Sequence, residues 1–195
     1  MLIREAEILP PHFKMLVLRN AVTRPHWTSM YNYVRNRISR LTSKSLKHNV
    51  KLINSGKSYK IYFVKDRVGE PIAWLYLYRK PNWKAWEVYQ IWTFPEYRGQ
   101  GLAQKLYKAA INEDGIILAS GDLHTQYSQA LWKSFVRKNL FNIWAQDFKN
   151  LSLVGAVEYD KEQDAIECSL PIYLKPSSRE STKSDVRFLA TKKCQ

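Results

Sequence analysis

The fold is decided by residues 91–107, which read IWTFPEYRGQGLAQKLY. The β-branched and aromatic start predicts a strand, and the apolar spacing that follows predicts a helix over residues 98–112. Between them, Gly99 and Gly101 lack a Cβ atom, so the backbone can approach a ligand closely. The N–H groups at the start of a helix favour an anion. The stretch therefore predicts a cradle for a phosphate or pyrophosphate, with Arg98 beside it.

The segments around this stretch alternate between strand and helix patterns, which predicts one α/β domain with a mixed sheet. Residues 43–58 read as a basic connection, and residues 66–71 read as a hairpin turn. Asn139 is expected as a left-handed helix cap. The Ser-rich residues 174–195 are expected to form a loose polar tail. The predicted strands are 2–6, 60–65, 73–78, 86–94, 116–120, 141–148, 151–159 and 165–173, and the predicted helices are 13–22, 27–41, 98–112 and 126–138.

Length and composition narrow the class of protein. The chain has 195 residues, of which 45% are hydrophobic and 13% aromatic, which suits a single globular domain. No apolar run is long enough to span a membrane, and Arg4 and Glu5 stand where a signal peptide needs apolar residues. A cytoplasmic protein is therefore expected. Cys168 and Cys194 make neither a disulfide framework nor a metal-ligand set, so no metal is expected.

The net charge of +14 is concentrated in one region. Residues 8–65 contain no Asp or Glu, whereas Lys and Arg recur throughout them. Such a segment attracts polyanions, so nucleic acid is the first partner to consider, before an anionic membrane surface or an acidic protein. A solubilising surface is the alternative interpretation. The residues expected to contact an anionic acceptor are Arg24, Arg35, Arg37, Arg40, Lys44 and Lys47.

The glycine-containing turn resembles the acyl-CoA site of the GNAT superfamily of N-acyltransferases. The signature of that superfamily is Arg or Gln, two residues, Gly, one residue, then Gly or Ala, which Arg98, Gly101 and Ala103 match here after Pro95-Glu-Tyr97. The order of strands and helices over residues 1–173 is also similar. The resemblance implies a mostly antiparallel mixed sheet flanked by helices, with residues 8–65 on the acceptor side.

The resemblance further implies an enzyme that moves an acyl group, most simply acetyl, from acyl-CoA to an amine. Acetyl-CoA or another acyl-CoA would lie in an opening between the fourth and fifth strands of the superfamily. An amine would attack the thioester after a base removes its proton, and the thiolate would leave with help from an acid. The residues implied to hold acyl-CoA are Ile91, Thr93, Arg98, Gly99, Gln100, Gly101, Leu102 and Ala103.

The catalytic groups are less clearly marked. Glu87 lies on the strand where the superfamily often has a carboxylate base, and its alternative is a surface carboxylate. Asp122 and His124 follow the next strand, in residues 120–132, which resemble acyltransferase-like proteins of bacteriophages; either can instead belong to a helix-capping loop. The tyrosine that serves as the acid in many members is missing. Ser134, Tyr127 or a water are the substitutes, or the thiolate leaves unaided.

Three functions remain open from the sequence. The acceptor of an N-acyltransferase with this charge would be anionic, either a DNA base or an aminoacyl-tRNA, and Trp27, Tyr31, Tyr33, Trp83 and Trp86 are available for base stacking. The second is a GNAT-like module without turnover that binds nucleic acid or another partner. The third is protein or peptide N-acetylation. A homodimer and a phage origin, with the host cytoplasm as location, also remain open.

Overall fold

The computed structural model describes residues 26–55, 57–81, 83–121, 123–124, 126–147, 153–161, 165–168, 182–183 and 186–193. The chain divides into two compact units, one of Met1–Tyr76 and Ile91–Tyr107 and the other of Leu77–Gln90 and Lys108–Gln195. Strands β4 (Pro71–Tyr78) and β5 (Trp86–Thr93) contribute residues to both. The predicted strand 2–6 and helix 13–22 lie outside the described residues. The strands form a mostly antiparallel mixed sheet with helices beside it, which confirms the predicted α/β class.

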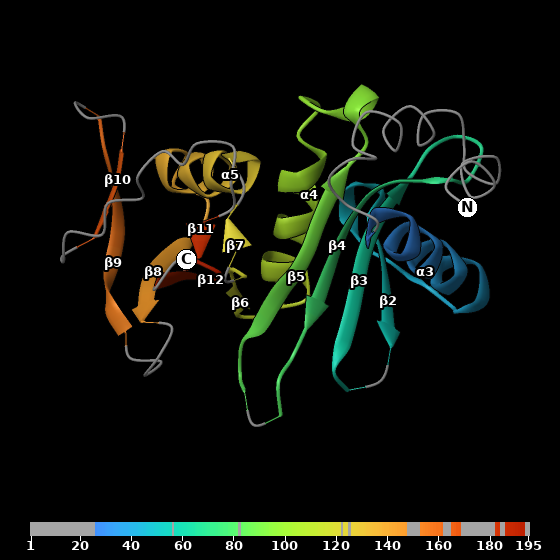
Figure 1. Ribbon diagram of the computed structural model, residues 1–195, viewed down its shortest axis with the longest axis horizontal. Helices are drawn as coiled ribbons and strands as arrows, with labels where there is room; N and C mark the ends of the chain where they lie inside the picture. The colour runs from blue at the N-terminus through green and yellow to red at the C-terminus, as the bar shows by residue number, and fades with distance from the viewer. Residues whose placement is uncertain are drawn as a thin grey trace. The chain divides into compact units, whose positions relative to one another are not determined.

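In the first unit, helix α3 (His26–Arg40) lies against β3 (Tyr59–Lys65) and β4 (Figure 1). The predicted helix over residues 27–41 is confirmed, and it buries Tyr31 and Val34 fully, whereas the apolar Leu41 just after it is exposed. The ring of Tyr31 lies 6.1 Å from that of Trp74 and 5.8 Å from that of Phe94, measured between centroids. Packing of these rings against the helix therefore fixes α3 on the sheet.

The basic connection predicted over residues 43–58 is wrong, because that segment forms part of the sheet. It contains β1 (Lys44–Ser45), a 3-10 turn (Lys47–Asn49) and β2 (Lys51–Ser55), and β2 pairs antiparallel with β3. The neighbouring side chains of Leu52 and Ile53 are both buried, one on each face. A strand buried on both faces lacks the apolar–polar alternation by which strands are recognised.

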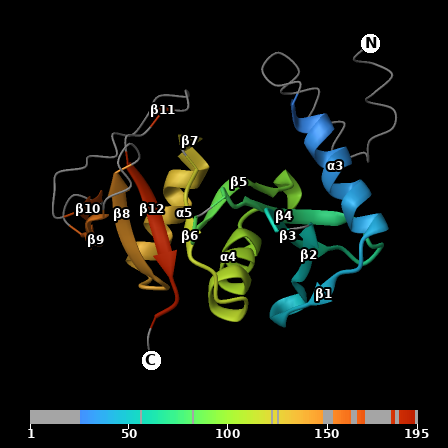
Figure 2. The same cartoon turned by 90° about the horizontal axis from the view of Figure 1, so that it is seen from below.

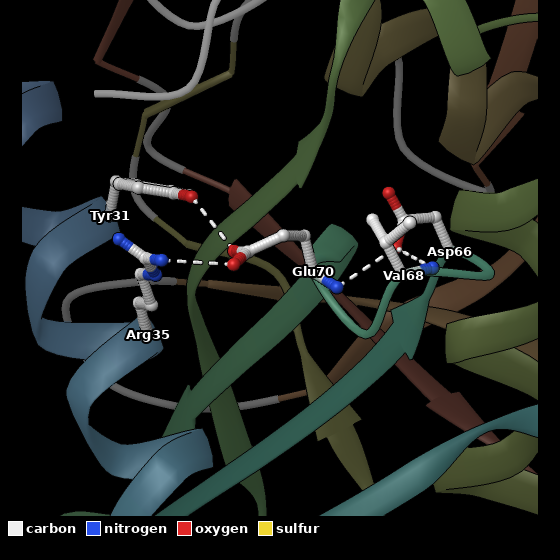
Figure 3. A network of polar contacts seen from close by, with 5 residues as sticks. All are labelled: Tyr31, Arg35, Asp66, Val68 and Glu70. Atoms are coloured by element: carbon white, nitrogen blue, oxygen red, sulfur yellow. Dashed lines mark hydrogen bonds and ion pairs between the residues drawn. The ribbon is translucent and has the colours of Figure 1, made fainter.

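The turn between β3 and β4 is confirmed and is held by a carboxylate on each side (Figure 3). Asp66 Oδ1 accepts hydrogen bonds from the N–H groups of Val68 at 3.0 Å and Glu70 at 2.8 Å. The Glu70 carboxylate in turn accepts one from Arg35 at 2.9 Å and one from the Tyr31 hydroxyl at 3.3 Å. Burial, and then the charge of Glu70, raises the pKa of Tyr31 well above its ordinary value.

In the second unit the strand order is β5-β6-β12-β8-β9-β10. β5 and β6 are parallel, and the other described neighbours are antiparallel. Helix α5 (Gln126–Arg137) packs on β12 through Trp132, whose ring centroid lies 5.3 Å from that of Phe188. The elements are β6 (Leu118–Ala119), β7 (Leu123–His124), α5 (Gln126–Arg137), β8 (Asn142–Asp147), β9 (Leu153–Asp160), β10 (Ala165–Cys168), β11 (Thr182–Lys183) and β12 (Val186–Thr191).

The C-terminal region departs most from the sequence prediction. Within the expected loose tail, residues 186–191 form β12, which lies between β6 and β8 and runs beside β8 in Figure 2. Phe188 and Ala190 are buried, as is the charged Arg187 that directly precedes Phe188. Six residues of strand in a Ser- and Lys-rich context carry too little apolar character to predict a central strand.

Candidate active site

The predicted cradle begins where β5 ends. A 3-10 turn over Pro95–Tyr97 follows, in which the N–H groups of Tyr97 and Arg98 donate to the carbonyls of Phe94 and Pro95 at 2.9 and 3.2 Å. Helix α4 (Leu102–Lys108) then starts four residues later than predicted. The delay arises because Gly99 and Gly101 adopt φ angles of +78° and +72°, outside the helical region.

Glycine is favoured at positions 99 and 101 by the backbone conformation and not by a lack of space for a side chain. A Cβ atom placed on either one would meet nothing within 4 Å, so the space beside them is open, while their positive φ would strain other residues. The first helical hydrogen bond runs from the Lys105 N–H to the Gly101 carbonyl at 3.0 Å. The N–H groups of residues 102–104 therefore have no acceptor within the helix. An open turn with such donors fits the pyrophosphate of acyl-CoA.

Arg98 is positioned by the end of β5. Its Nε donates to the Thr93 carbonyl at 3.2 Å, and its guanidinium carbon lies 5.6 Å from the centroid of the Trp92 ring. The side chain is exposed at the start of the glycine turn. Arg98 thus places a fixed positive charge beside the cradle, as the sequence predicts. Among the other predicted acyl-CoA residues, Ile91 and Thr93 are half-buried and Gln100 is exposed.

The α-helix passes into a π-helical turn (Ala109–Glu113), which the sequence did not predict. The turn buries Ala109, Ala110 and Ile111 together. Gly115 follows with a φ of +66°, which confirms that this glycine ends the helix. Burial raises the pKa of Tyr107, in the last turn of α4, well above its ordinary value.

Glu87, the predicted base, lies in the part of β5 that belongs to the second unit. It is paired in register with Ala119 of β6. Its Oε2 lies 3.3 Å from Lys80 Nζ and 3.5 Å from Arg187 Nη1. The side chain of Glu87 is 17% exposed, against 1% for Arg187. Glu87 is therefore a largely enclosed carboxylate that pairs with two cations, and its role as the base stays a prediction.

The sequence analysis did not identify Arg187 as a site residue, nor Lys80 and Trp83, which contact it or its partner Glu87. The guanidinium carbon of Arg187 lies 4.4 Å from the centroid of the Trp83 ring, and Lys80 Nζ lies 5.1 Å from the same centroid. We call Lys80, Trp83, Glu87 and Arg187 the Arg187 cluster. Arginine in a polar segment is ordinarily a surface residue, so nothing in the sequence marked it as buried.

The loop after β6 is tied to the C-terminal strand. The Ser120 N–H donates to the Phe188 carbonyl at 2.8 Å, and the Phe188 N–H donates to Ser120 Oγ at 2.9 Å. A Cβ atom on Gly121 would lie 2.8 Å from the Val88 carbonyl oxygen, so only glycine fits there. The backbone of His124 pairs with that of Thr182. Asp122 lies outside the described residues, and only the backbone of His124 is described.

The predicted acid, Ser134, lies half-buried on α5, where its carbonyl accepts the Lys138 N–H at 3.0 Å. The backbone of Ser134 is therefore held in the helix, and the role of its hydroxyl as an acid stays a prediction. Tyr127, the other hydroxyl candidate, is 74% exposed at the start of the same helix. Within the described chain, no three His, Cys, Asp or Glu side chains group as metal ligands.

The predicted acceptor residues lie on α3 and on the β1–β2 hairpin, except Arg24, which is outside the described residues. Arg35 is paired with Glu70, and Arg37 lies with its guanidinium carbon 5.1 Å from the centroid of the Tyr33 ring. Arg40, Lys44 and Lys47 are exposed. His48 and Asn49, with φ of 58° and 61°, form the tight turn that presents Lys47.

Comparison with known proteins places the chain in a family. The model of the acetyltransferase (GNAT) family matches residues 27–135, which is more than half of the chain. The chain therefore belongs to the GNAT acetyltransferase family, whose members are enzymes that use acetyl-CoA or another acyl-CoA. No curated protein matches it in sequence.

Several solved acetyltransferase structures are similar to the chain at low identity. The ribosomal-protein-S18-alanine N-acetyltransferase from Escherichia coli is 16% identical, with 84% of this chain and 88% of that chain covered and a TM-score of 0.40. A GNAT-family acetyltransferase from Staphylococcus aureus is 15% identical, covering 74% and 72%, with a TM-score of 0.40. PaiA N-acetyltransferase from Thermoplasma acidophilum, solved with coenzyme A, is 15% identical, covering 76% and 79%, with a TM-score of 0.34.

No described helix is long and apolar enough to cross a membrane.

Proposed function

We propose that this protein transfers an acyl group, most simply acetyl, from acyl-CoA to an amine on an anionic acceptor, and that the acceptor is a nucleic acid. The observation that carries the proposal is the turn at residues 98–101, where two left-handed glycines leave open space in front of the first N–H groups of α4. Residues 8–65 contain no Asp or Glu, and Arg40, Lys44 and Lys47 within them are exposed. This positive charge supports an anionic acceptor.

Acyl-CoA supplies the acyl group as a thioester. The N–H groups of residues 99–103 and the charge of Arg98 bind its pyrophosphate, and the backbone at Ile91 and Thr93 holds the thioester carbonyl. Glu87 is the proposed base. The amine nitrogen forms the new C–N bond with its lone pair, its proton passes to the Glu87 carboxylate, and the C–S bond breaks with its electron pair on sulfur. The thiolate then takes up a proton, so Glu87 ends as the carboxylate.

Asp122, His124 and Ser134 stay predictions for the base and the acid. Glu87 is preferred as the base because its carboxylate is held in the described structure and keeps part of its surface exposed. The two acceptor forms are a DNA base and the amino group of an aminoacyl-tRNA. The bacteriophage subtype indicated by residues 120–132 also stays a prediction.

Calorimetric titration with acetyl-CoA tests the cradle. We expect micromolar binding by the wild type and at least about tenfold weaker binding by Gly101→Glu combined with Arg98→Ala, because a side chain fills the turn and the charge is lost. Gly69→Glu is the matched control, since Gly69 also has a positive φ and open space around it but lies in the β3–β4 turn. A wild type that binds neither acetyl-CoA nor longer acyl-CoAs would contradict the proposal.

Transfer of labelled acetyl from acetyl-CoA identifies the acceptor. Parallel reactions contain mixed aminoacyl-tRNA, deacylated tRNA, single-stranded DNA, double-stranded DNA or a peptide mixture. We expect label in a nucleic-acid fraction. Label in peptides alone would favour protein N-acetylation, and acetyl-CoA binding without transfer would favour a module that has lost turnover.

A further inference from the structure

Arg187 is buried in β12, a strand far from Glu87 in the sequence, yet it reaches the proposed base. Its side chain is 1% exposed, and its Nη1 lies 3.5 Å from Glu87 Oε2. A buried guanidinium requires a countercharge and close packing, because the transfer of a charge out of water is costly. Glu87 supplies the charge, and the ring of Trp83, at 4.4 Å from the guanidinium carbon, supplies the packing.

The contacts to the Glu87 carboxylate are one-sided. Both cations, Arg187 and Lys80, approach Oε2, which is buried and has no hydrogen-bond partner. Oε2 is therefore the oxygen that lies near both cations, which makes Oε1 the better placed oxygen to take up a proton. A base that must be within hydrogen-bond reach of its substrate benefits from such anchoring.

The backbone of Arg187 is itself well fixed. It is paired in register with Gln146 of β8, and its neighbour Phe188 exchanges two hydrogen bonds with Ser120 at 2.8 and 2.9 Å. Ser120 directly follows β6, the strand that pairs with β5 at Glu87. The guanidinium thus extends from a strand that is hydrogen-bonded to the same parallel pair that carries the carboxylate.

We propose that Arg187 is a positioning residue for acyl transfer, which holds Glu87 through Oε2 and leaves Oε1 for the proton of the amine. This inference rests on the proposed function, in which Glu87 is the base. It assigns to residues 186–191 a part in the reaction, although they lie outside the segment that matches the family.

The test measures release of CoA thiol from acetyl-CoA as a function of pH, with the acceptor found above or with water as acceptor where none is found. We expect Glu87→Gln to lower kcat by about 100-fold. Arg187→Met should lower kcat by about tenfold to 100-fold with an unchanged KM for acetyl-CoA, and Arg187→Lys should restore part of the loss. The pH dependence of kcat/KM should shift in Arg187→Met, because the countercharge of the base is gone.

The double variant Glu87→Gln with Arg187→Met separates positioning from a general loss of structure. If Arg187 acts through Glu87, the double variant retains the kcat of Glu87→Gln alone. The inference would be overturned if the kcat losses of the two single variants multiplied in the double variant. It would also be overturned if Arg187→Met kept the kcat and the pH profile of the wild type. Arg79→Met is the matched control, because Arg79 also stacks on a tryptophan, Trp86, at 4.9 Å but has no ion pair with Glu87.

If Arg187→Met does not fold, Lys80→Met replaces it. Lys80 is 43% exposed and contacts the same Oε2, so its replacement leaves Arg187 and the ion pair of Arg187 with Glu87 in place. A wild-type profile in Lys80→Met together with wild-type activity in Arg187→Lys would then overturn the inference. A wild type that releases no thiol under any condition would contradict the proposed function, and the inference with it, whereas an active wild type with insensitive variants contradicts the inference alone.

Discussion

Two arginine–glutamate pairs, one in each unit, differ in length and in exposure. Arg35 and Glu70 are 2.9 Å apart with side chains 44% and 29% exposed, whereas Arg187 and Glu87 are 3.5 Å apart with side chains 1% and 17% exposed. The shorter pair is the weaker one by physical reasoning, because water solvates both of its partners when the contact breaks. The longer pair has no such alternative, so exposure and not distance decides the effect of each pair on stability.

The largest effect is expected from Glu87→Ala. Removal of this carboxylate takes an ion-pair partner from the buried Arg187 guanidinium, which should lower the free energy of unfolding by about 3 kcal/mol. Arg187→Met should lower it less, because the remaining Glu87 is partly exposed and can be hydrated. Urea unfolding followed by circular dichroism measures both. Equal losses in the two variants would contradict the dominant role of burial.

A pH effect should follow from Tyr31, which donates to the exposed pair. The folded state raises the pKa of Tyr31 through burial and through Glu70, so it favours the neutral phenol. This stabilisation is complete below pH 10, the ordinary tyrosine value, and is lost as the pH rises above 10, by up to about 1.4 kcal/mol per pH unit. Thermal unfolding between pH 9 and 11 should show a shallower decline in Tyr31→Phe. An unchanged decline would show that Tyr31 does not titrate with unfolding.

An intermediate effect is expected where the strand of the buried pair is anchored. Ser120→Ala removes the acceptor of the Phe188 N–H, a buried donor, and should lower the free energy of unfolding by about 1 kcal/mol. Chemical denaturation measures this difference. Ser39→Ala is the control, since the Ser39 hydroxyl bonds a carbonyl of its own helix at an exposed position. A loss in Ser39→Ala as large as that in Ser120→Ala would contradict the assignment.

The smallest effect is expected from Arg35→Met, the direct counterpart of Arg187→Met. It should lower the free energy of unfolding by about 0.5 kcal/mol, and added salt should reduce this difference further. The effect of Arg187→Met should change little with salt, because the buried pair is shielded from ions. Melting temperatures at low and high salt provide the measurement. A salt-dependent loss in Arg187→Met would mean that the Arg187 cluster is accessible to solvent.

The sequence was sufficient where local chemistry determines structure. Helix α3 follows from its apolar spacing, the β3–β4 turn from Asp66, and the end of α5 from Asn139, whose φ is +50°. The cradle was predicted because two glycines, a preceding strand and a following helix occur together within a few residues. Each of these features depends on neighbours in the chain.

The sequence was insufficient where distant segments determine structure. β2 and β12 are short and show no apolar–polar alternation, so their sequences resemble polar connections. Both are strands because they pair with neighbouring strands, β2 with β3 and β12 with β8. Glu87 was found as a candidate base, but its cation partners could not be, since Arg187 is separated from it by most of the second unit. Burial of an arginine depends on packing that no local pattern reports.

The position of β12 between β6 and β8 has a consequence for synthesis of the protein. A ribosome completes β6 and β8 long before it completes β12, and the contact between Ser120 and Phe188 spans 68 residues. The sheet of the second unit therefore cannot close before β12 has been made, and until then β6 and β8 each have one edge unpaired. In this interval the nascent chain is prone to mispairing, which makes chaperone engagement most useful before residue 191 leaves the ribosome.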